Sequence, residues 1–314
     1  MTSLETRRDD RAEPAGGSTP SRSGGSARSR AAPWTGRRAA WALCSWLVAL
    51  VVGAVIAAVA LGALAESRAQ RQLLTQFRVQ VSSAAEAAEG PFGGIEATDP
   101  PATGTPVALV QIGRLGLQRV VVEGARPGDT QAGPGHVPGT AGPGQPGNSG
   151  IVGRQAAYGG AFGRLGDLVV GDEILVTTVQ GQTVYQVQEN QQVAAAEVDR
   201  ALDPSANDRL TLVVGAGVRP GSRARVVTAQ LNGRPFPPTP QGGRTLESGG
   251  GIGQSGSWPL VIIWGGLLLG TAAAAGWLYR HWYARSTYLL STPALVALLV
   301  LSADAAARLL PAWT

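Results

Sequence analysis

Residues 133–155 read GPGHVPGTAGPGQPGNSGIVGRQ, and this stretch decides the fold. A run so rich in glycine and proline is usually a linker. Here it runs into a short apolar segment, Ser149 to Val152, and then stops at Gly153-Arg154-Gln155. Because strand-like patterning lies on both sides of it, the stretch is predicted to form a shaped surface within a β domain.

Three pairs of short apolar segments surround this stretch, and turn residues separate the members of each pair. The segments are residues 107–112 and 117–122, 173–179 and 182–187, and 210–214 and 224–231. The middle pair flanks Gln180-Gly181, which is a hairpin signal. Short strands at this spacing predict an all-β barrel or sandwich over residues 105–235.

Composition excludes several kinds of site. The single cysteine, Cys44, lies in an apolar run, so the β domain holds no disulfide, no thiolate metal site and no cysteine nucleophile. The two histidines, His136 and His281, are too few and too far apart for a histidine-based metal site. We therefore predict no metal and no cofactor.

The charge is distributed unevenly along the chain. Residues 1–38 hold eight arginines and four acidic residues, whereas residues 90–257 hold 12 arginines and 13 acidic residues. The β domain is therefore close to neutral and carries no basic stripe, which argues against nucleic acid as a partner. The positive charge lies beside apolar segments, where it indicates membrane topology.

Apolar segments long enough for membrane helices occur at both ends of the chain. Residues 39–65 contain no charge, and neither do residues 258–279. Residues 288–310 form a weaker third candidate, because Pro293 lies near its start and Asp304 and Arg308 near its end. The latter two are four residues apart on one helix face and are expected to pair.

The full organisation follows from these segments. We predict a disordered, Arg-rich cytoplasmic tail (1–38), a transmembrane helix (39–65), a juxtamembrane helix and linker (66–104), the β domain (105–235), a flexible linker (236–257), a second transmembrane helix (258–279), a cytoplasmic loop (280–287) and a third transmembrane helix (288–310). Arginine in the tail and in the short loop places both on the cytoplasmic side. The protein is then a multi-pass membrane protein, with the β domain and Thr314 outside the cell.

Six motifs within the β domain occur in the same order and spacing as in one known family. They are VVVEG (120–124), GPGHVPGT (133–140), PGNSGIVG (146–153), FGRLGDLVVGDEILV (162–176), RLTLVV (209–214) and RARVV (223–227). On these motifs the chain resembles the sortases, the membrane-anchored cysteine transpeptidases of Gram-positive bacteria, and most of all the actinobacterial class E type. The resemblance implies an eight-stranded sortase-like β-barrel, flanked by transmembrane α-helices and held in the cell envelope.

The resemblance also implies where catalytic groups would stand. A sortase uses a cysteine nucleophile, a histidine for proton exchange and an arginine that steadies the oxyanion or the substrate. Here Gly215 stands at the cysteine position, Arg154 at the histidine position and Arg225 at the arginine position, with Arg223 as an alternative for the last. Glycine has no side chain, and arginine stays protonated near neutral pH. The resemblance therefore implies a pseudo-sortase with no catalytic residue.

Three further residues are expected at the edge of the groove: His136, Ser149 and Thr211. Either hydroxyl would need an activating base to act as a nucleophile, and His136 is the one histidine of the β domain. His136 is expected to be a structural loop residue. Arg154 is expected either to bind a carboxylate or peptide carbonyl or to lie in solvent.

The sequence thus predicts a catalytically inactive sortase-fold protein that acts by binding. The expected partners are the membrane and an extracellular peptide, a pilin-like or envelope protein, or another sortase. Two alternatives stay open. One is an active transpeptidase with an unrecognised nucleophile, and the other is a subunit of a membrane assembly in which the barrel is a spacer.

Overall fold

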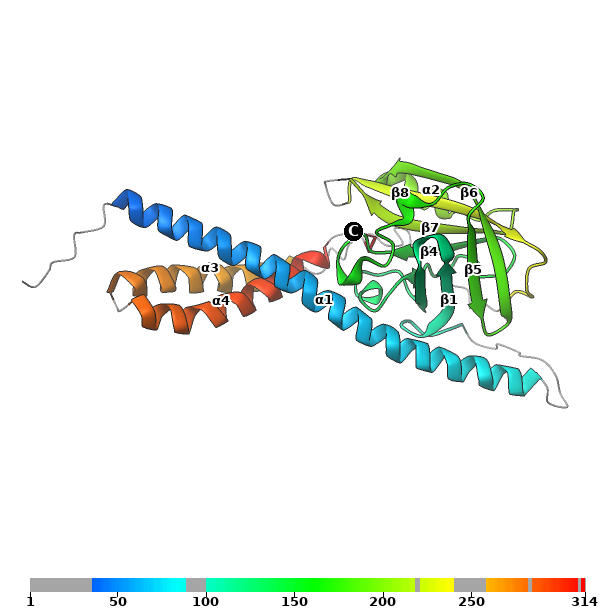
Figure 1. Ribbon diagram of the computed structural model, residues 1–314, viewed down its shortest axis with the longest axis horizontal. Coiled ribbons are helices and arrows are strands. Elements are labelled where there is room, and N and C mark those ends of the chain that lie inside the picture. The colour runs from blue at the N-terminus through cyan, green and yellow to red at the C-terminus, as the bar shows by residue number, and fades with distance from the viewer. Residues whose placement is uncertain are drawn as a thin grey trace, which may run out of the picture. The chain divides into compact units, whose positions relative to one another are not determined.

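The computed structural model describes residues 36–88, 100–217, 221–239, 258–281, 284–309 and 312–313. Eight strands among them close into a barrel in the order β1-β2-β3-β4-β7-β8-β6-β5 (Figure 1). The strands are β1 (Pro106–Ile112), β2 (Leu117–Glu123), β3 (Gly135–His136), β4 (Asn148–Gly153), β5 (Glu173–Thr178), β6 (Gly181–Ala194), β7 (Arg209–Ala216) and β8 (Arg223–Asn232). The prediction of an all-β, eight-stranded barrel is confirmed.

Each of the three predicted segment pairs forms an antiparallel strand pair: β1 with β2, β5 with β6, and β7 with β8. The β5–β6 hairpin turns at Gln180-Gly181, as the sequence predicts. The Gly- and Pro-rich stretch supplies β3 and β4. A short helix between β6 and β7, α2 (Val198–Leu202), has no counterpart in the sequence prediction.

Strands β4 and β7 run parallel and are buried along almost their whole length, whereas β1 alternates between buried and partly exposed positions. The inner face contributes Ile151 and Leu212 to the barrel core, and the outer face packs beneath α2. Gly150 permits this second layer, because a Cβ atom there would lie 2.6 Å from Leu202 Cδ2. Gly150 therefore serves close packing and not flexibility.

The helix that precedes the barrel, α1 (Gly36–Ala88), continues without a break from the first predicted span into the predicted juxtamembrane helix. Its apolar stripe packs on the outer face of β2, where Leu73 and Phe77 form one cluster with Val120 and Val122. This contact buries apolar surface that β2 would otherwise expose to solvent.

Gln70 of α1 adds polar contacts beside this cluster. Its side-chain amide donates to the carbonyl oxygens of Val120 at 3.0 Å and Ala132 at 2.7 Å, and its Oε1 accepts from the Val120 N–H at 2.8 Å. Parallel pairing of β2 with β3 begins only at Val122, so Gln70 satisfies main-chain groups of β2 before that point.

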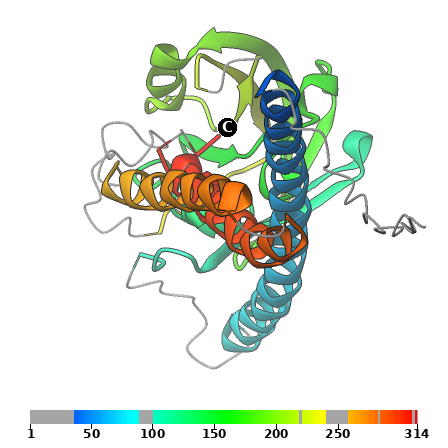
Figure 2. The same cartoon turned by 90° about the vertical axis from the view of Figure 1, so that its left-hand side faces the viewer.

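Two helices follow the barrel and lie side by side, α3 (Trp258–His281) and α4 (Ala284–Ala307) (Figure 2). Among the described residues, Trp258–Leu278 is long and apolar enough to cross a membrane, and Ser291–Ala305 is a shorter apolar helix. The first and third predicted spans remain predictions. The predicted tail and most of both predicted linkers lie outside the described residues.

The packing of α1 on β2 can be tested by truncating one side chain. Phe77 is 3% exposed, so Phe77→Ala should lower the free energy of unfolding by about 3–5 kcal/mol through lost burial and a residual cavity. The matched control is Val79→Ala on the same helix, where the side chain is 62% exposed and little change is expected. Denaturant unfolding of the purified chain measures both. Equal stabilities for the two variants would show that α1 does not pack on the barrel.

Candidate functional site

The strand register brings the three sortase-equivalent positions to one end of the barrel. Gly153 pairs with Val214, and Val214 pairs in turn with Arg225 across β7 and β8. Arg154 follows Gly153 directly, and Gly215 follows Val214 and pairs with Ala224. This end of β4, β7 and β8 is therefore the candidate site.

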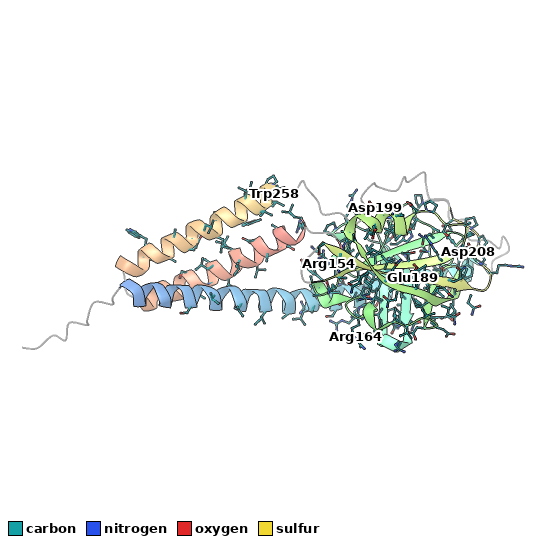
Figure 3. The ribbon with its side chains drawn as sticks, turned by 90° about the horizontal axis from the view of Figure 1, so that it is seen from above. Arg154, Arg164, Glu189, Asp199, Asp208 and Trp258 are labelled. Carbon is teal, nitrogen blue, oxygen red and sulfur yellow. The ribbon has the colours of Figure 1, made fainter. Side chains whose placement is uncertain are left out.

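Arg154, labelled in Figure 3, is deeply buried, with 3% of its surface exposed. Its Nη2 donates to the carbonyl oxygen of Pro127, and its Nε donates to Thr130 Oγ1 at 3.2 Å. Burial lowers the pKa of Arg154, while Tyr158 and Asp304 oppose that shift. The side chain therefore holds the segment before β3 against the end of β4 and does not lie in solvent.

The ring of Tyr158 covers Arg154, whose guanidinium carbon lies 4.9 Å from the ring centroid. Tyr158 has a φ of 48°, in the left-handed region that a bulky side chain rarely adopts. Its hydroxyl donates to Asp304 Oδ1 at 2.7 Å, and Asp304 also pairs with Arg308 at 2.8 Å. The predicted Asp304–Arg308 pair is thus confirmed. The hydrogen bond from Tyr158 to Asp304 anchors α4 to the loop after β4.

Gly215 takes part in the site through its main chain. Its N–H donates to the carbonyl oxygen of Trp313 at 2.6 Å, a residue that follows α4 in the sequence. The candidate site is therefore occupied by a segment of the same chain.

Arg225 is partly exposed, in contrast to Arg154. Its Nη1 donates to Asn190 Oδ1 at 2.9 Å, and the Asn190 amide donates to the carbonyl oxygens of Leu165 at 3.1 Å and Leu168 at 2.8 Å. Asn190 therefore ties the arginine of β8 to the loop between β4 and β5. Of the two arginines at the candidate site, Arg225 is the one placed to contact a ligand.

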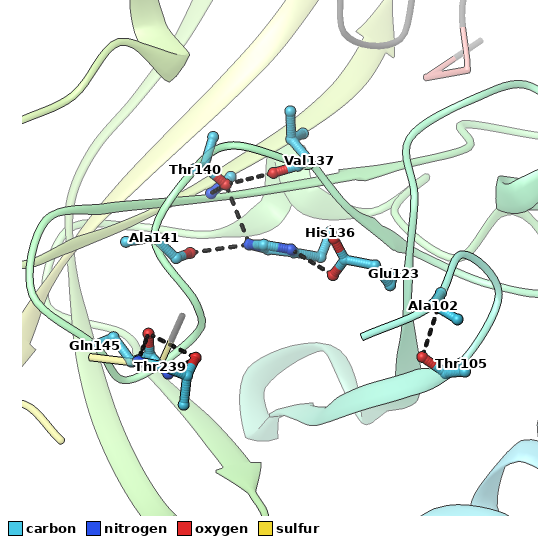
Figure 4. A network of polar contacts seen from close by, with 10 residues as sticks. Ala102, Thr105, Glu123, His136, Val137, Thr140, Ala141, Gln145 and Thr239 are labelled. Atoms are coloured by element: carbon cyan, nitrogen blue, oxygen red, sulfur yellow. Dashed lines mark hydrogen bonds and ion pairs between the residues drawn. The ribbon is translucent and has the colours of Figure 1, made fainter. Parts of the chain in front are cut away.

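His136 lies in a buried polar network on β3 (Figure 4). Its Nδ1 lies 2.8 Å from Glu123 Oε2, and its Nε2 lies 2.9 Å from the carbonyl oxygen of Ala141 and 3.1 Å from Thr140 Oγ1. The Thr140 hydroxyl donates to the carbonyl oxygen of Val137 at 2.7 Å. This arrangement fixes the loop between β3 and β4, as expected of a structural histidine.

The two hydroxyls expected at the groove edge, Ser149 and Thr211, are also buried, each with 0% exposure. Thr211 Oγ1 donates to Asn148 Oδ1 at 2.7 Å, and Ser149 Oγ has no hydrogen-bond partner among the described residues. The described contacts of the His136 ring are with Glu123, Thr140 and Ala141, and neither hydroxyl is among them.

A cavity of about 580 Å³ lies beside the histidine network, and its lining includes Glu123, His136, Gln145 and Gln180. Gln145, in the loop between β3 and β4, donates a 3.0 Å hydrogen bond to Gln180 in the turn of the β5–β6 hairpin. Thr140 does not line this cavity. The hydroxyl closest to the imidazole is therefore not presented to the cavity.

Comparison with known families decides the nature of this barrel. Residues 110–231 match the sortase domain. The match contains seven of the eight strands whole or in large part, together with Arg154, Gly215 and Arg225. The barrel therefore matches the sortase fold.

Several solved sortase structures are similar to the chain. A Clostridium perfringens sortase D5 transpeptidase shares 24% sequence identity, covering 53% of this chain and 99% of its own, with a TM-score of 0.45. Sortase E from Streptomyces avermitilis shares 27% identity, with coverages of 42% and 91% and a TM-score of 0.39. Sortase E1 from Streptomyces coelicolor, solved with a tripeptide in the active site, shares 23%, with coverages of 43% and 93% and a TM-score of 0.38. The comparison with curated proteins gave no match.

The family match corrects the prediction that this chain is not an enzyme. That prediction rested on the residue types at positions 154 and 215, whereas residues 110–231, which include both positions, match the sortase domain. Nothing among the described residues demonstrates positively that activity has been lost. Arg154 and Gly215, at the positions of the family's histidine and cysteine, are therefore not sufficient to exclude catalysis.

Sequence reasoning missed several residues that build the site, among them Thr130, Tyr158, Asn190 and Trp313. Trp313 lies far along the sequence from the three motif positions, and Tyr158, four residues after Arg154, belongs to no motif that would mark it. Polar residues such as Thr130 and Asn190 carry no signal of their own until the fold brings them beside the arginines.

The contact between Tyr158 and Asp304 predicts a pH effect. Burial, and then the hydrogen bond to Asp304, raise the pKa of Tyr158 from 10.0 to about 12. Above pH 10 the unfolded chain loses this proton while the folded chain keeps it, so stability should fall as the pH rises toward 12. Tyr158→Phe should flatten this fall in melting temperatures measured from pH 8 to 11. An unchanged slope would show that Tyr158 is not shielded by α4.

Proposed function

We propose that this chain is a membrane-anchored sortase-fold protein of the cell envelope, closest in type to class E, that binds a peptide segment of an extracellular partner at the end of β4, β7 and β8. The observation that carries the proposal is the main-chain contact at Gly215, where a carbonyl oxygen of another segment already accepts the N–H. A site whose main-chain N–H already holds one segment of chain in this way is suited to hold another.

Charge supports a peptide ligand at this end. Arg225 is partly exposed and is oriented by Asn190, so its guanidinium has further donors for a carbonyl or carboxylate of a bound peptide. Arg154 is engaged with Pro127 and Thr130 and shapes the wall of the site instead. The proposed ligand therefore meets one arginine and not two.

The proposed orientation places the barrel outside the cell and residues 280–287 inside. It is supported by the arginine-rich tail and by the helix Trp258–Leu278, which is long enough to span. The contact of Trp313 with Gly215 adds support, because it requires the segment after α4 to lie on the same side of the membrane as the barrel.

The orientation predicts two different reporter signals. A reporter that is active only in the cytoplasm should be active when fused at residue 284 and silent when fused after residue 314. The physical reason is the positive charge of the short loop, which favours the cytoplasmic side. Activity of both fusions would show that the segment 288–310 does not cross the membrane.

Transpeptidation is a second candidate function, and the match of residues 110–231 to the sortase domain favours it. The described hydroxyl closest to an imidazole is that of Thr140, at 3.1 Å from His136 Nε2, with Glu123 on the other side of the ring. A hydroxyl, an imidazole and a carboxylate in series are the groups of a nucleophile and its base. In the closed structure the Thr140 hydroxyl donates to Val137 and the His136 Nε2 faces the carbonyl oxygen of Ala141, so this candidate requires the loop between β3 and β4 to rearrange.

One assay distinguishes binding from turnover. A quenched fluorescent sorting-signal peptide is incubated with the full chain and triglycine, and with the chain shortened after residue 309. Binding is followed by anisotropy and cleavage by fluorescence. We expect Arg225→Ala to weaken binding by about 10-fold to 100-fold, since charge-assisted hydrogen bonds are lost.

The matched control is Arg223→Ala, an exposed arginine two residues away on the same strand. Absence of binding to either form of the chain would contradict the proposal. Turnover that His136→Gln and Thr140→Val both abolish would establish the transpeptidase instead.

A further inference from the structure

Strand β7 extends beyond the end of β4, which leaves space at the candidate site. The last β4–β7 pair is Gly153 with Val214, whereas β7 continues to Ala216 alongside β8. The N–H of Gly215 donates to the carbonyl oxygen of Trp313 at 2.6 Å. Residues 312–313 thus make a main-chain contact with β7 just past the end of β4.

A second hydrogen bond holds the same segment. Thr130 Oγ1 accepts from Arg154 Nε at 3.2 Å, so its own proton is free to point elsewhere. The carbonyl oxygen of Ala312 lies 3.3 Å from this hydroxyl, closer than that of Pro127 at 3.5 Å. Arg154 therefore acts as a positioning residue that turns the Thr130 hydroxyl toward Ala312.

The side chain of Trp313 fills an apolar pocket and is 2% exposed. Its cluster contains residues of three strands and of the segment between β2 and β4: Ala125, Val137, Val152, Val213, Ala224 and Val226. The pocket thus lies on the outer face of the barrel and receives one large aromatic side chain.

One feature of this contact is imperfect. The indole Nε1 of Trp313 is buried and has no hydrogen-bond partner among the described residues. A buried donor without an acceptor opposes binding, since the group loses its bond to water without replacement. The segment is therefore held by shape and by two hydrogen bonds, one from the Gly215 main chain and one from the Thr130 side chain, but less firmly than a fully satisfied ligand.

We propose that residues 312–313 are a tethered ligand of a peptide-binding pocket, and that an extracellular peptide with a large aromatic side chain binds there by displacing them. The pocket supplies the Gly215 N–H and the Thr130 hydroxyl for two consecutive carbonyl oxygens, and an apolar seat for the aromatic ring. This inference rests on the proposed peptide-binding function, and it specifies the ligand and the event that opens the site.

Tethering explains why the site would be closed by default. A segment joined to the same chain acts at an effective concentration that reaches the millimolar range for short connections. A free peptide with the same contacts must compete against that concentration, so its apparent affinity for the intact chain is reduced. Removal of Trp313 should restore the intrinsic affinity.

Hydrogen exchange of the full chain in detergent tests the closed state without any added peptide. In Trp313→Ala the Gly215 amide should exchange at least tenfold faster than in the wild type, because its acceptor is no longer held in place. The Val213 amide, within the β4–β7 pair, should not change. The control is Trp277→Ala, in which an indole that is 62% exposed is removed from α3.

Anisotropy with a fluorescein-labelled peptide of residues 309–314 tests the pocket as a ligand site. This peptide should bind Trp313→Ala at least tenfold more tightly than it binds the wild type. Thr130→Val, which removes one hydroxyl and keeps the side-chain size, should show a smaller increase in Gly215 exchange. This second variant keeps the test valid if Trp313→Ala perturbs folding.

The outcomes separate this inference from the proposed function. Unchanged Gly215 exchange in both variants would show that residues 312–313 do not close the site, and faster exchange without binding of the 309–314 peptide would show that they are packing and not a ligand. If that peptide binds the opened chain but sorting-signal peptides bind neither form, the inference stands and the proposed partner class is wrong.

Discussion

The parallel pairing of β4 with β7 is the constraint on which the rest of the structure depends. Both strands are covered on two faces, by the barrel core on one side and by α2 and Trp313 on the other. A strand pair buried on both faces needs apolar residues at consecutive positions and small residues wherever a second layer approaches closely. Gly150, beneath Leu202, meets the second requirement.

The same constraint explains the different fates of the two arginines. Arg154 directly follows β4 and lies against the segment before β3. Its guanidinium group contacts Pro127, Thr130 and the ring of Tyr158, so it is not available to a ligand. Arg225 lies near the start of β8 and is partly exposed. The positive cleft expected from two facing guanidinium groups is therefore reduced to a single accessible charge, and that charge lies on the opposite face of β8 from Ala224 and Val226, which line the apolar pocket of Trp313.

Much of the barrel could be predicted from the sequence. Paired apolar segments around turn residues located six of the strands, and the apolar end of the stretch 133–155 located β4. The two-residue strand β3 was not located, because His136 was expected to lie in a loop. The short helix α2 was missed because five residues carry too little periodicity to be recognised. The stripe of Leu73, Phe77 and Val81 predicted a helix, but the sequence contains no signal that this stripe faces Val120 and Val122.

The position of the candidate site could be predicted from the sequence, but the side-chain contacts within it could not. Motif spacing placed Arg154, Gly215 and Arg225 together, and the register agrees. Whether a side chain points into a groove depends on contacts distant in sequence, as between Thr130 and Ala312 or between Tyr158 and Asp304, and these follow from the closed fold. Residue type alone also misled on function, since it suggested the loss of activity that the family match does not support.

The helix α1 has a consequence for where the barrel can work. Residues 66–88 continue the helix of the first predicted span, and Leu73, Phe77 and Gln70 fasten β2 directly to it. At 1.5 Å per residue, a helix of this length beyond the span rises about 35 Å. A barrel that packs directly on a rigid helix has less freedom of position than one attached through a flexible linker. If residues 39–65 span the membrane as the sequence predicts, this attachment holds the barrel at a set height above the lipid.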